Sequence, residues 1–199
     1  MRLTHAVLVI ADISGYTAFI TNRQTSLLHA EQIITDLLLS MIDRTAHPLI
    51  LNKLEGDAAF LFAETGDDLA GAIRDVLLQV SLLFSAFAER LALIREERAE
   101  CVCNACAKVA DLQLKAFVHC GEIAIKQIRQ FEELAGEEVI LIHRLMKNKV
   151  EGREYVLLTA PIYWAVPTVT ALGHLHHEEF DGVGMLDLLR LTPIELAQA

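Results

Sequence analysis

The sequence predicts an α+β domain with helices on one face of a mostly antiparallel sheet. Strand-like and helix-like segments alternate in the order βαββαββα, and further strand-like segments follow them. In addition, 53% of the 199 residues are hydrophobic, which is enough for a buried core. We therefore expect a single domain over residues 1–199, with a cysteine-rich loop inserted at residues 98–111.

The first half of the chain predicts a strand, a helix, a hairpin and a second, long helix. Their ranges are residues 5–11 for the strand, 16 to about 47 for the helix, 49–54 and 57–63 for the hairpin, and about 67–98 for the long helix. The hairpin turn falls at Glu55-Gly56, because two apolar runs meet there. Asp67 and Asp68 are favourable at the positive end of the long helix.

The second half predicts five strands and one helix after the cysteine-rich loop. Their ranges are residues 112–119 and 123–128 for two strands, 136–148 for the helix, and 155–158, 172–180 and 185–191 for three more strands. Cys120-Gly121-Glu122 is predicted to turn the chain between the first two of these strands. The helix carries Arg144 and Lys147 near its C-terminal end, where cations are favourable.

Charge and hydropathy narrow the class of partner. The formal net charge of −10 argues against nucleic acid as a partner, because a phosphate backbone binds to a basic face. A single nucleotide is compatible with this charge, since a metal ion and a few backbone N–H groups can hold its phosphates. No uninterrupted apolar run approaches the roughly 20 residues of a membrane span, and the first residues lack a signal-peptide pattern. We expect a cytoplasmic protein without a membrane partner.

Two apolar runs carry an aspartate at a strand end. Asp12 ends the run that starts at Val7, and Asp57 lies between the runs that start at Leu51 and end at Phe62. A carboxylate at the edge of a buried strand is costly unless a cation compensates it. Two such carboxylates therefore suggest a shared divalent metal ion and phosphate chemistry.

Residues 13–17, Ile-Ser-Gly-Tyr-Thr, link the first strand to a helix start through a glycine turn. Backbone N–H groups and the helix dipole at such a turn form an anion site beside Asp12. Other interpretations stay open for each segment alone. Ser14 and Thr17 are also suitable helix caps, and the Glu-Gly-Asp57 sequence is also a good turn.

Four blocks of the sequence resemble, in order, the catalytic domain of class III adenylate and guanylate cyclases. They are Ala11-Asp-Ile-Ser-Gly-Tyr-Thr17, Lys53-Leu-Glu-Gly-Asp-Ala58, Leu114-Lys-Ala-Phe-Val-His-Cys-Gly-Glu122 and Gly136-Glu-Glu-Val-Ile-Leu-Ile-His-Arg-Leu145. The chain also looks like an uncharacterised bacterial branch of this superfamily with a cysteine-rich loop. The resemblance implies a ferredoxin-like βαββαβ core with C-terminal β additions. It also implies a homodimer with its sites between two antiparallel subunits.

The resemblance further implies roles for individual residues. Asp12 and Asp57, with the carbonyl of Ile13, would hold two Mg²⁺ or Mn²⁺ ions at the phosphates of a purine nucleoside triphosphate. The implied phosphate loop consists of Ile13, Ser14, Gly15, Tyr16 and Thr17.

The resemblance implies three further contacts, two with the purine base and one with the phosphates in the transition state. Lys53 and Glu133 would bind the purine, and Arg144 would reach the phosphates of the partner subunit as the catalytic residue.

Two departures from the family pattern bear on turnover. The family's asparagine falls on Ile140, which cannot hydrogen-bond the ribose, and its phosphate-binding lysine falls on Asp181. Catalysis depends on contacts made in the transition state, so we expect nucleotide binding with weak or degenerate activity. An active cyclase and a zinc-stabilised dimeric interaction module without nucleotide are the alternatives.

Cys101, Cys103 and Cys106 combine C-x-C with C-x-x-C spacing. Cytosolic thiols at this spacing more often bind a metal than form disulfides, and a structural Zn²⁺ takes four ligands. Cys120 is expected about 25 Å away, at the far end of a strand that rises about 3.3 Å per residue. The fourth ligand is therefore expected from the partner subunit or from another loop, with the candidates His174, His176 and His177. A metal-free thiol loop is the alternative.

Overall fold

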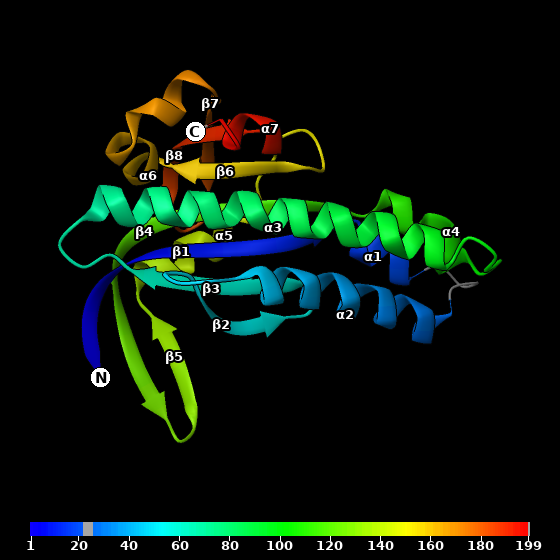
Figure 1. The fold of residues 1–199 in the computed structure, drawn as a ribbon. Coiled ribbons are helices and arrows are strands. Elements are labelled where there is room, and N and C mark those ends of the chain that lie inside the picture. Colours follow the sequence, from blue (N-terminus) through cyan, green and yellow to red (C-terminus); the bar gives the residue numbers. More distant parts are fainter. Residues whose placement is uncertain (22–25, 199) are drawn as a thin grey trace.

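The computed structural model describes residues 1–21 and 26–198 and contains, within them, an eight-stranded sheet flanked by helices (Figure 1). The strands are β1 (Arg2–Ser14), β2 (Ile50–Glu55), β3 (Ala58–Glu64), β4 (Gln113–Ile128), β5 (Phe131–Ala135), β6 (Tyr155–Thr159), β7 (His174–Phe180) and β8 (Gly184–Leu191). The helices are α1 (Tyr16–Ile20), α2 (Leu27–Arg44), α3 (Leu69–Glu97), α4 (Asn104–Lys108), α5 (Glu137–Leu145), α6 (Ala160–Ala165) and α7 (Pro193–Leu196), with the 3₁₀ turns η1 (Val109–Asp111) and η2 (Pro167–Ala171). The predicted α+β fold class is confirmed.

The sheet has the strand order β2-β3-β1-β4-β6-β8-β7, and β5 pairs with β4 outside this path. Its neighbouring strands are antiparallel except for β4 and β6. Strand β1 is central and pairs with β3 on one side and with β4 on the other. Its register places Asp12 opposite Ala58 on β3 and opposite Lys115 on β4.

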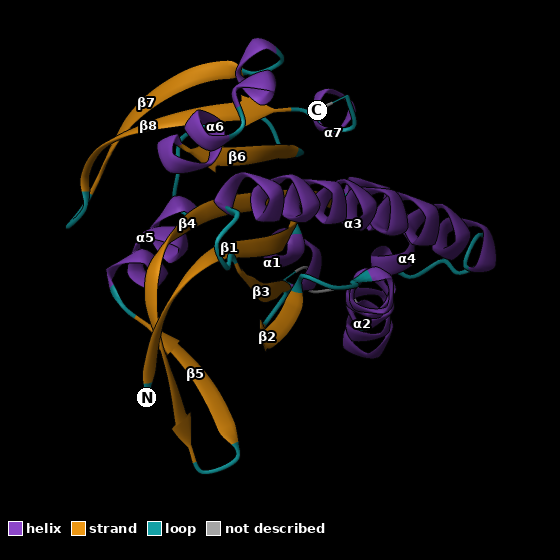
Figure 2. Cartoon of the chain, turned by 60° about the vertical axis from the view of Figure 1, so that its left-hand side comes forward, coloured by secondary structure: helices purple, strands orange, loops and turns teal. Residues whose placement is uncertain are grey.

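Both faces of the sheet are covered, because the apolar run in β1 presents alternate side chains to opposite sides. Val7 and Val9 pack with α2, α3 and α4, whereas Ala6 and Leu8 pack with α5. Figure 2 shows α5 on the side of the sheet opposite to α2 and α3. The expectation that the helices share one face therefore holds for α2 and α3 and is wrong for α5.

The predicted turn at Cys120-Gly121-Glu122 is wrong, because β4 runs through these residues without a break. Each of them pairs with a residue of β1, so the ladder continues past the glycine. Gly121 instead allows a close approach of α5, since a Cβ at this position would lie 2.6 Å from Glu138. The far end of β4 and the unpredicted β5 form a two-stranded arm that extends from the body (Figure 1).

The helix predicted after Gly15 forms two helices, α1 and α2, and part of the predicted range lies outside the described residues. Helix α2 begins after Ser26, whose hydroxyl oxygen accepts a hydrogen bond from the backbone N–H of His29 at 3.4 Å. The cysteine-rich segment, which was predicted as a loop, contains α4 and η1. The short helices α6 and α7 were not predicted.

By length and composition, α3 is long and apolar enough to cross a membrane. In its most apolar stretch of 18 residues, 44% is buried inside the protein. Its buried side chains, which include Ile73, Val76 and Phe87, belong to the core cluster between α3 and the sheet. A core helix passes the same test of length and composition, so this helix alone carries no argument for a membrane span.

Candidate functional site

Two backbone features bring Asp12 and Asp57 together at the end of β1. The carbonyl oxygen of Asp57 accepts a hydrogen bond from the backbone N–H of Ile13 at 3.2 Å. Asp57 also immediately precedes Ala58, the residue that pairs with Asp12 across β1 and β3. The β2–β3 turn is thus fixed against the strand end that carries Asp12.

The carboxyl groups of both aspartates are difficult to ionise. Burial raises the pKa of Asp12, the negative charge of Asp57 raises it further, and Lys115 opposes the shift, which leaves a pKa of about 6. Burial also raises the pKa of Asp57, against a hydrogen bond from its own backbone. Among the described residues, no Lys, Arg or His lies within ion-pair distance of either carboxylate.

This donor set fits a divalent cation. Mg²⁺ and Mn²⁺ prefer oxygen ligands, and a cation between two partly buried carboxylates would offset both the burial and the mutual repulsion. Asp12 and Asp57 are the side chains that would hold it, and the position of Ile13 beside them is compatible with its predicted carbonyl contact.

The predicted phosphate loop turns at Gly15, whose φ of +98° is accessible to few residues other than glycine. Neither Ser14 nor Thr17 caps α1, which begins after Gly15 without a side-chain cap. Tyr16 donates a hydrogen bond from its hydroxyl to Glu31 at 3.2 Å. Because α1 has only five residues, its dipole contributes little to an anion site.

The predicted purine contacts also lie together. Lys53 Nζ is 3.3 Å from a carboxylate oxygen of Glu133, which joins β2 to β5. The same amine is 3.6 Å from Glu55, whose carboxylate bonds in turn to His143 on α5 at 2.9 Å. The cation and the anion that would bind a purine are therefore paired with each other in this state.

Arg144 lies in the last turn of α5, next to this network. It lines a shallow cavity with Val139, Ile140, His143 and Lys147. The side chain of Ile140 is 59% exposed on the same helix. Ile140, which the resemblance aligns with the family's asparagine, thus presents an apolar side chain at the surface of α5.

The three clustered cysteines converge on a histidine that the sequence analysis missed. His29 Nδ1 lies 3.6 Å from Cys101 Sγ, 3.4 Å from Cys103 Sγ and 3.8 Å from Cys106 Sγ. The four ligand atoms all lie within 4.8 Å of one another. One ring nitrogen carries at most one proton and cannot hydrogen-bond three thiols at once, so the arrangement is typical of a metal site.

The spacing also matches the geometry of zinc. A tetrahedron with Zn–S bonds of about 2.3 Å and a Zn–N bond of about 2.0 Å has S···N edges of about 3.5 Å. Burial opposes ionisation of the Cys103 thiol, but hydrogen bonds from Cys106, His29 and Cys101 outweigh burial and lower its pKa to about 6. Burial and hydrogen bonds to the other thiols raise the pKa of Cys106 to about 12.

The expectation of a fourth ligand from the His174–His177 segment is wrong. His176 bonds to Glu178 and His177 bonds to Asp187, both within the β7–β8 hairpin. His29 instead stands in the first turn of α2, which packs against α4. The only local signal was an isolated histidine three residues after a helix cap.

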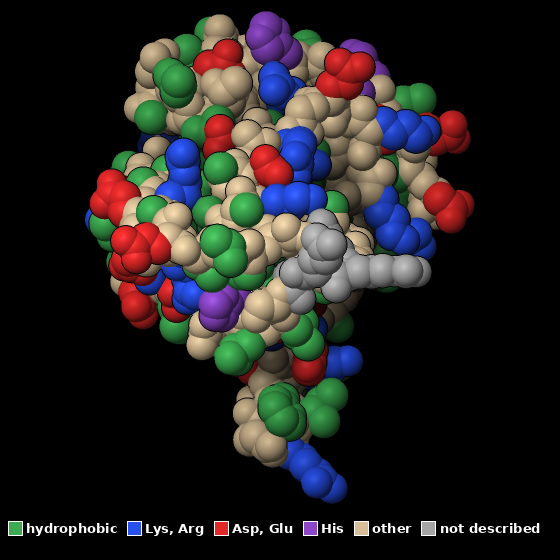
Figure 3. All heavy atoms as spheres, turned by 90° about the vertical axis from the view of Figure 1, so that its right-hand side faces the viewer, with side chains coloured by type: hydrophobic (Ala, Val, Ile, Leu, Met, Phe, Trp, Pro, Cys, Tyr) green, Lys and Arg blue, Asp and Glu red, His purple; other side chains and the backbone are tan. Residues whose placement is uncertain are grey.

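Two cations near the aspartates were also missed. Lys115 lies directly opposite Asp12 on β4, and Arg153 lies against Gly15. The position of Lys115 follows from the strand register alone, whereas no local pattern indicates Arg153. Figure 3 views the molecule from the end where α1 and α4 lie in Figure 1, and several Lys and Arg side chains gather in the middle of this face.

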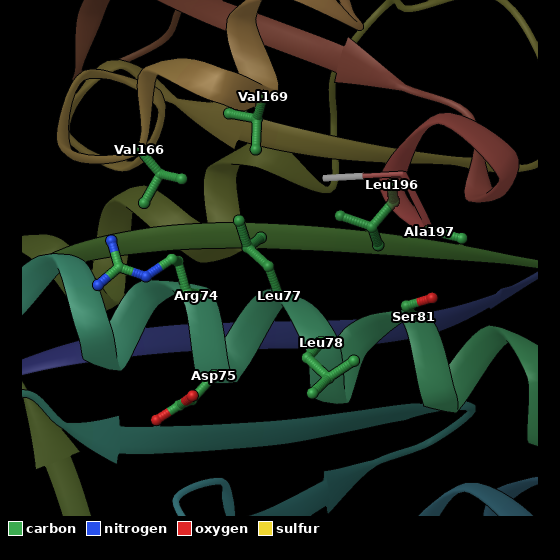
Figure 4. Close-up of a pocket in the computed structure, with 9 residues that line it drawn as sticks. All are labelled: Arg74, Asp75, Leu77, Leu78, Ser81, Val166, Val169, Leu196 and Ala197. Carbon is green, nitrogen blue, oxygen red and sulfur yellow. The ribbon is translucent and has the colours of Figure 1, made fainter.

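A separate cavity lies between α3, the η2 segment and α7 (Figure 4). Its lining is mostly aliphatic, and Leu77 points toward Val169 across it, while Arg74 and Asp75 point in opposite directions. None of the residues described above lines this cavity, and it offers no matched set of acids, bases or ligands.

The fold is that of class III adenylyl and guanylyl cyclase domains. The chain is similar to the guanylyl cyclase Cya2, with 13% identity and a TM-score of 0.71 over 95% of this chain and 92% of that one. It is similar to the adenylyl cyclase CyaB from P. aeruginosa, with 15% identity and a TM-score of 0.68 over 96% and 95%. It is also similar to a class III adenylyl cyclase-like ATP-binding protein from Pseudomonas aeruginosa, with 16% identity and a TM-score of 0.70 over 85% and 36%.

Sequence comparison identifies the family of the chain. The profile of the family described as "Protein of unknown function (DUF2652)" matches residues 34–155. The uncharacterised protein Rv2561/Rv2562 of Mycobacterium tuberculosis (strain ATCC 25618 / H37Rv) is 33% identical over 152 residues, which cover 76% of this chain and 69% of that protein. The chain belongs to the DUF2652 family.

The raised pKa of Asp12 predicts a pH-dependent effect of Asp12→Asn. A carboxyl whose pKa rises on folding, from about 3.9 when unfolded to about 6, destabilises the fold increasingly as the pH rises between these two values, and the loss of stability is complete above the folded pKa. Without added Mg²⁺ or Mn²⁺, Asp12→Asn should raise the melting temperature by a few degrees at pH 7.5, and the gain should vanish toward pH 4. Thermal unfolding across this pH range measures it.

Asp67→Asn is the matched control, because it removes an exposed carboxylate. It should show no comparable gain. If Asp12→Asn is no more stable than the unmodified protein at pH 7.5, Asp12 carries no burial penalty.

Proposed function

We propose that this protein binds a purine nucleoside triphosphate together with Mg²⁺ or Mn²⁺ and turns it over weakly or not at all. The observation that carries the proposal is the Asp12–Asp57 pair, two partly buried carboxylates with raised pKa values beside the Gly15 turn. Electrostatics at this position favours a divalent cation, and the guanidinium of Arg153 lies against the Gly15 turn. The ATP-binding cyclase-like protein from Pseudomonas aeruginosa has a similar fold, which supports the proposal.

The Lys53–Glu133 pair supports a purine as the base. A lysine donates hydrogen bonds and a glutamate accepts them. Lys53 could therefore bind an acceptor on the edge of a purine, and Glu133 could bind a donor. The contact between the two side chains at 3.3 Å would open when the base enters.

The chemistry of the site depends on contacts to ribose and phosphate. When bound, the divalent ion would neutralise phosphate charge and favour ionisation of the ribose hydroxyl. Arg144 would contact phosphate, whereas Ile140 offers no hydrogen bond to ribose and Asp181 would repel phosphate. The loss of the ribose contact removes transition-state stabilisation, and Asp181 weakens phosphate binding in the ground state as well, so we expect nucleotide binding with weak turnover.

We also propose a homodimer. The proposal rests on the resemblance, and large apolar side chains exposed on the elements around Lys53 and Glu133 are compatible with an interface there. They are Leu54 (49% exposed), Ile128 (51%), Phe131 (59%) and Ile140 (59%).

A second candidate function is a zinc-stabilised interaction module. The convergence of three thiols on His29 favours it, because a Cys₃His site is closed and structural. The zinc site and nucleotide binding are compatible, since the two sites use different residues.

Nucleotide binding is tested by thermal shift. With Mn²⁺, ATP or GTP should raise the melting temperature by several degrees, because a ligand at 100 times its Kd adds about 2.7 kcal/mol of stability. Asp57→Ala should abolish the shift, and Asp67→Ala, an exposed carboxylate outside the site, should retain it. No shift with either nucleotide contradicts the proposal.

Turnover is tested by restoring the two missing contacts. The unmodified protein should form little or no cyclic nucleotide from ATP or GTP, and the Ile140→Asn/Asp181→Lys double variant should form at least tenfold more. A single transition-state hydrogen bond corresponds to about a hundredfold in rate, which sets this scale. Chromatography of the products measures it, and efficient turnover by the unmodified protein would instead establish an active cyclase.

The metal cluster is tested by elemental analysis. The purified protein should contain about one zinc per chain, and His29→Ala or Cys103→Ser should lose most of it and melt several degrees lower. Cys120→Ala should keep its zinc, because Cys120 lies outside the cluster. Full zinc content in His29→Ala would show that His29 is not a ligand.

A further inference from the structure

Four adjacent strands present a row of polar side chains on one face of the sheet. Asp12 on β1 lies opposite Lys115 on β4, and Lys115 is in register with Tyr155 on β6. Arg190 on β8 completes the row, since it pairs with Leu157, two residues after Tyr155. Lys115 Nζ lies 5.0 Å and the Arg190 guanidinium carbon 5.8 Å from the centre of the Tyr155 ring. The row therefore holds two cations beside an aromatic ring, and a carboxylate beyond Lys115 at its β1 end.

Arg153 adds a third cation at the phosphate loop. It stands two residues before β6, and its guanidinium packs on Gly15, because a Cβ built on Gly15 would lie 2.3 Å from Arg153 Nη2. Lys115 is in register with Tyr155, two residues after Arg153. Arg153 and Lys115 therefore lie at the same end of the sheet, next to the Gly15 turn.

These cations lack direct anionic partners. Within the described ranges, Lys115, Arg153 and Arg190 form no ion pair, although the chain carries a net charge of −10. The Nε atom of Arg190 is also buried without a hydrogen-bond partner. Lys115 and Arg190 are partly buried and Arg153 is exposed. Like charges repel one another, so an anion bound between Lys115 and Arg153 would be favourable.

We propose that Arg153, beside Lys115, binds the terminal phosphates of the nucleotide over Gly15 within the same chain. This inference rests on the proposed nucleotide binding and goes beyond it by naming the group that replaces the family lysine absent at Asp181. The guanidinium supports this role, because its planar fork donates two parallel hydrogen bonds to phosphate oxygens. Glycine at position 15 leaves room for that fork at the turn, where a side chain would displace it.

The ligand class follows from the chemistry of the row. Divalent metal at Asp12 and Asp57 and the cations at Lys115 and Arg153 together match a polyphosphate, because its successive phosphate groups can contact several cations at once. A nucleoside monophosphate would reach fewer of these groups. The site should therefore discriminate by the number of phosphates more than by the base.

The experiment is a calorimetric titration of the full chain with the Mn²⁺ complexes of ATP, ADP and AMP and of inorganic tripolyphosphate. Arg153→Gln should weaken ATP and tripolyphosphate binding about tenfold or more, as expected for a lost hydrogen bond to a charged group, and should leave AMP binding within twofold. Arg153→Lys keeps the charge without the fork and should recover part of the affinity. Arg74→Gln removes one exposed cation near the start of α3 and serves as the matched control.

The outcomes separate this inference from the proposed function. If the unmodified protein binds ATP and Arg153→Gln binds it as tightly as Arg74→Gln does, the phosphate role of Arg153 is overturned while nucleotide binding stands. If the unmodified protein binds tripolyphosphate but not ATP, and Arg153→Gln weakens that binding, the phosphate role holds and the purine proposal fails. Equal melting temperatures of the free variants establish that the changes in affinity do not reflect unfolding.

Discussion

The register of β1 is the constraint on which the rest of the structure depends. This strand is apolar on both faces over residues 6–11, and it pairs with β3 over residues 6–12 and with β4 along its whole length. A slip by one residue would exchange the side chains that face α5 with those that face α2 and α3, so burial fixes the pairing. The same pairing places Asp12 beside Asp57 and opposite Lys115. Gly15 follows three residues later, directly after the end of β1. Core packing therefore fixes the positions of the candidate site residues, because these residues lie at the ends of the strands that the packing aligns.

The end of β1 combines carboxylates and cations that do not neutralise one another directly. Asp12 and Asp57 share a region of low solvation, and Lys115 and Arg153 lie beside it without forming ion pairs in the described part of the chain. Such an arrangement is less stable than a set of matched salt bridges. The site proposed above would take up both a metal ion and a polyanion, and such a site would need both kinds of charge available.

The sequence predicted the features that local patterns encode. Apolar runs marked most of the strands, and the family resemblance linked Asp12 to Asp57 and Lys53 to Glu133. What the sequence did not reveal depends on contacts between distant segments. The histidine beside the cysteines follows from the packing of α2 on α4, and Arg153 follows from the path of the loop before β6. The prediction of a turn at Gly121 was wrong because the sequence does not distinguish a glycine that lets a helix pack closely from a glycine that forms a turn.

The cysteine–histidine cluster has a consequence for the unfolded chain. His29 and Cys101 are 72 positions apart, and the segment between them contains α2, the β2–β3 hairpin and α3. A metal bound at both ends would close this segment into a loop. For a disulfide across a loop of that length, the lost chain entropy corresponds to about 4 kcal/mol at 25 °C. Metal availability would thereby set the conformational freedom of the stretch that carries both Lys53 and Asp57.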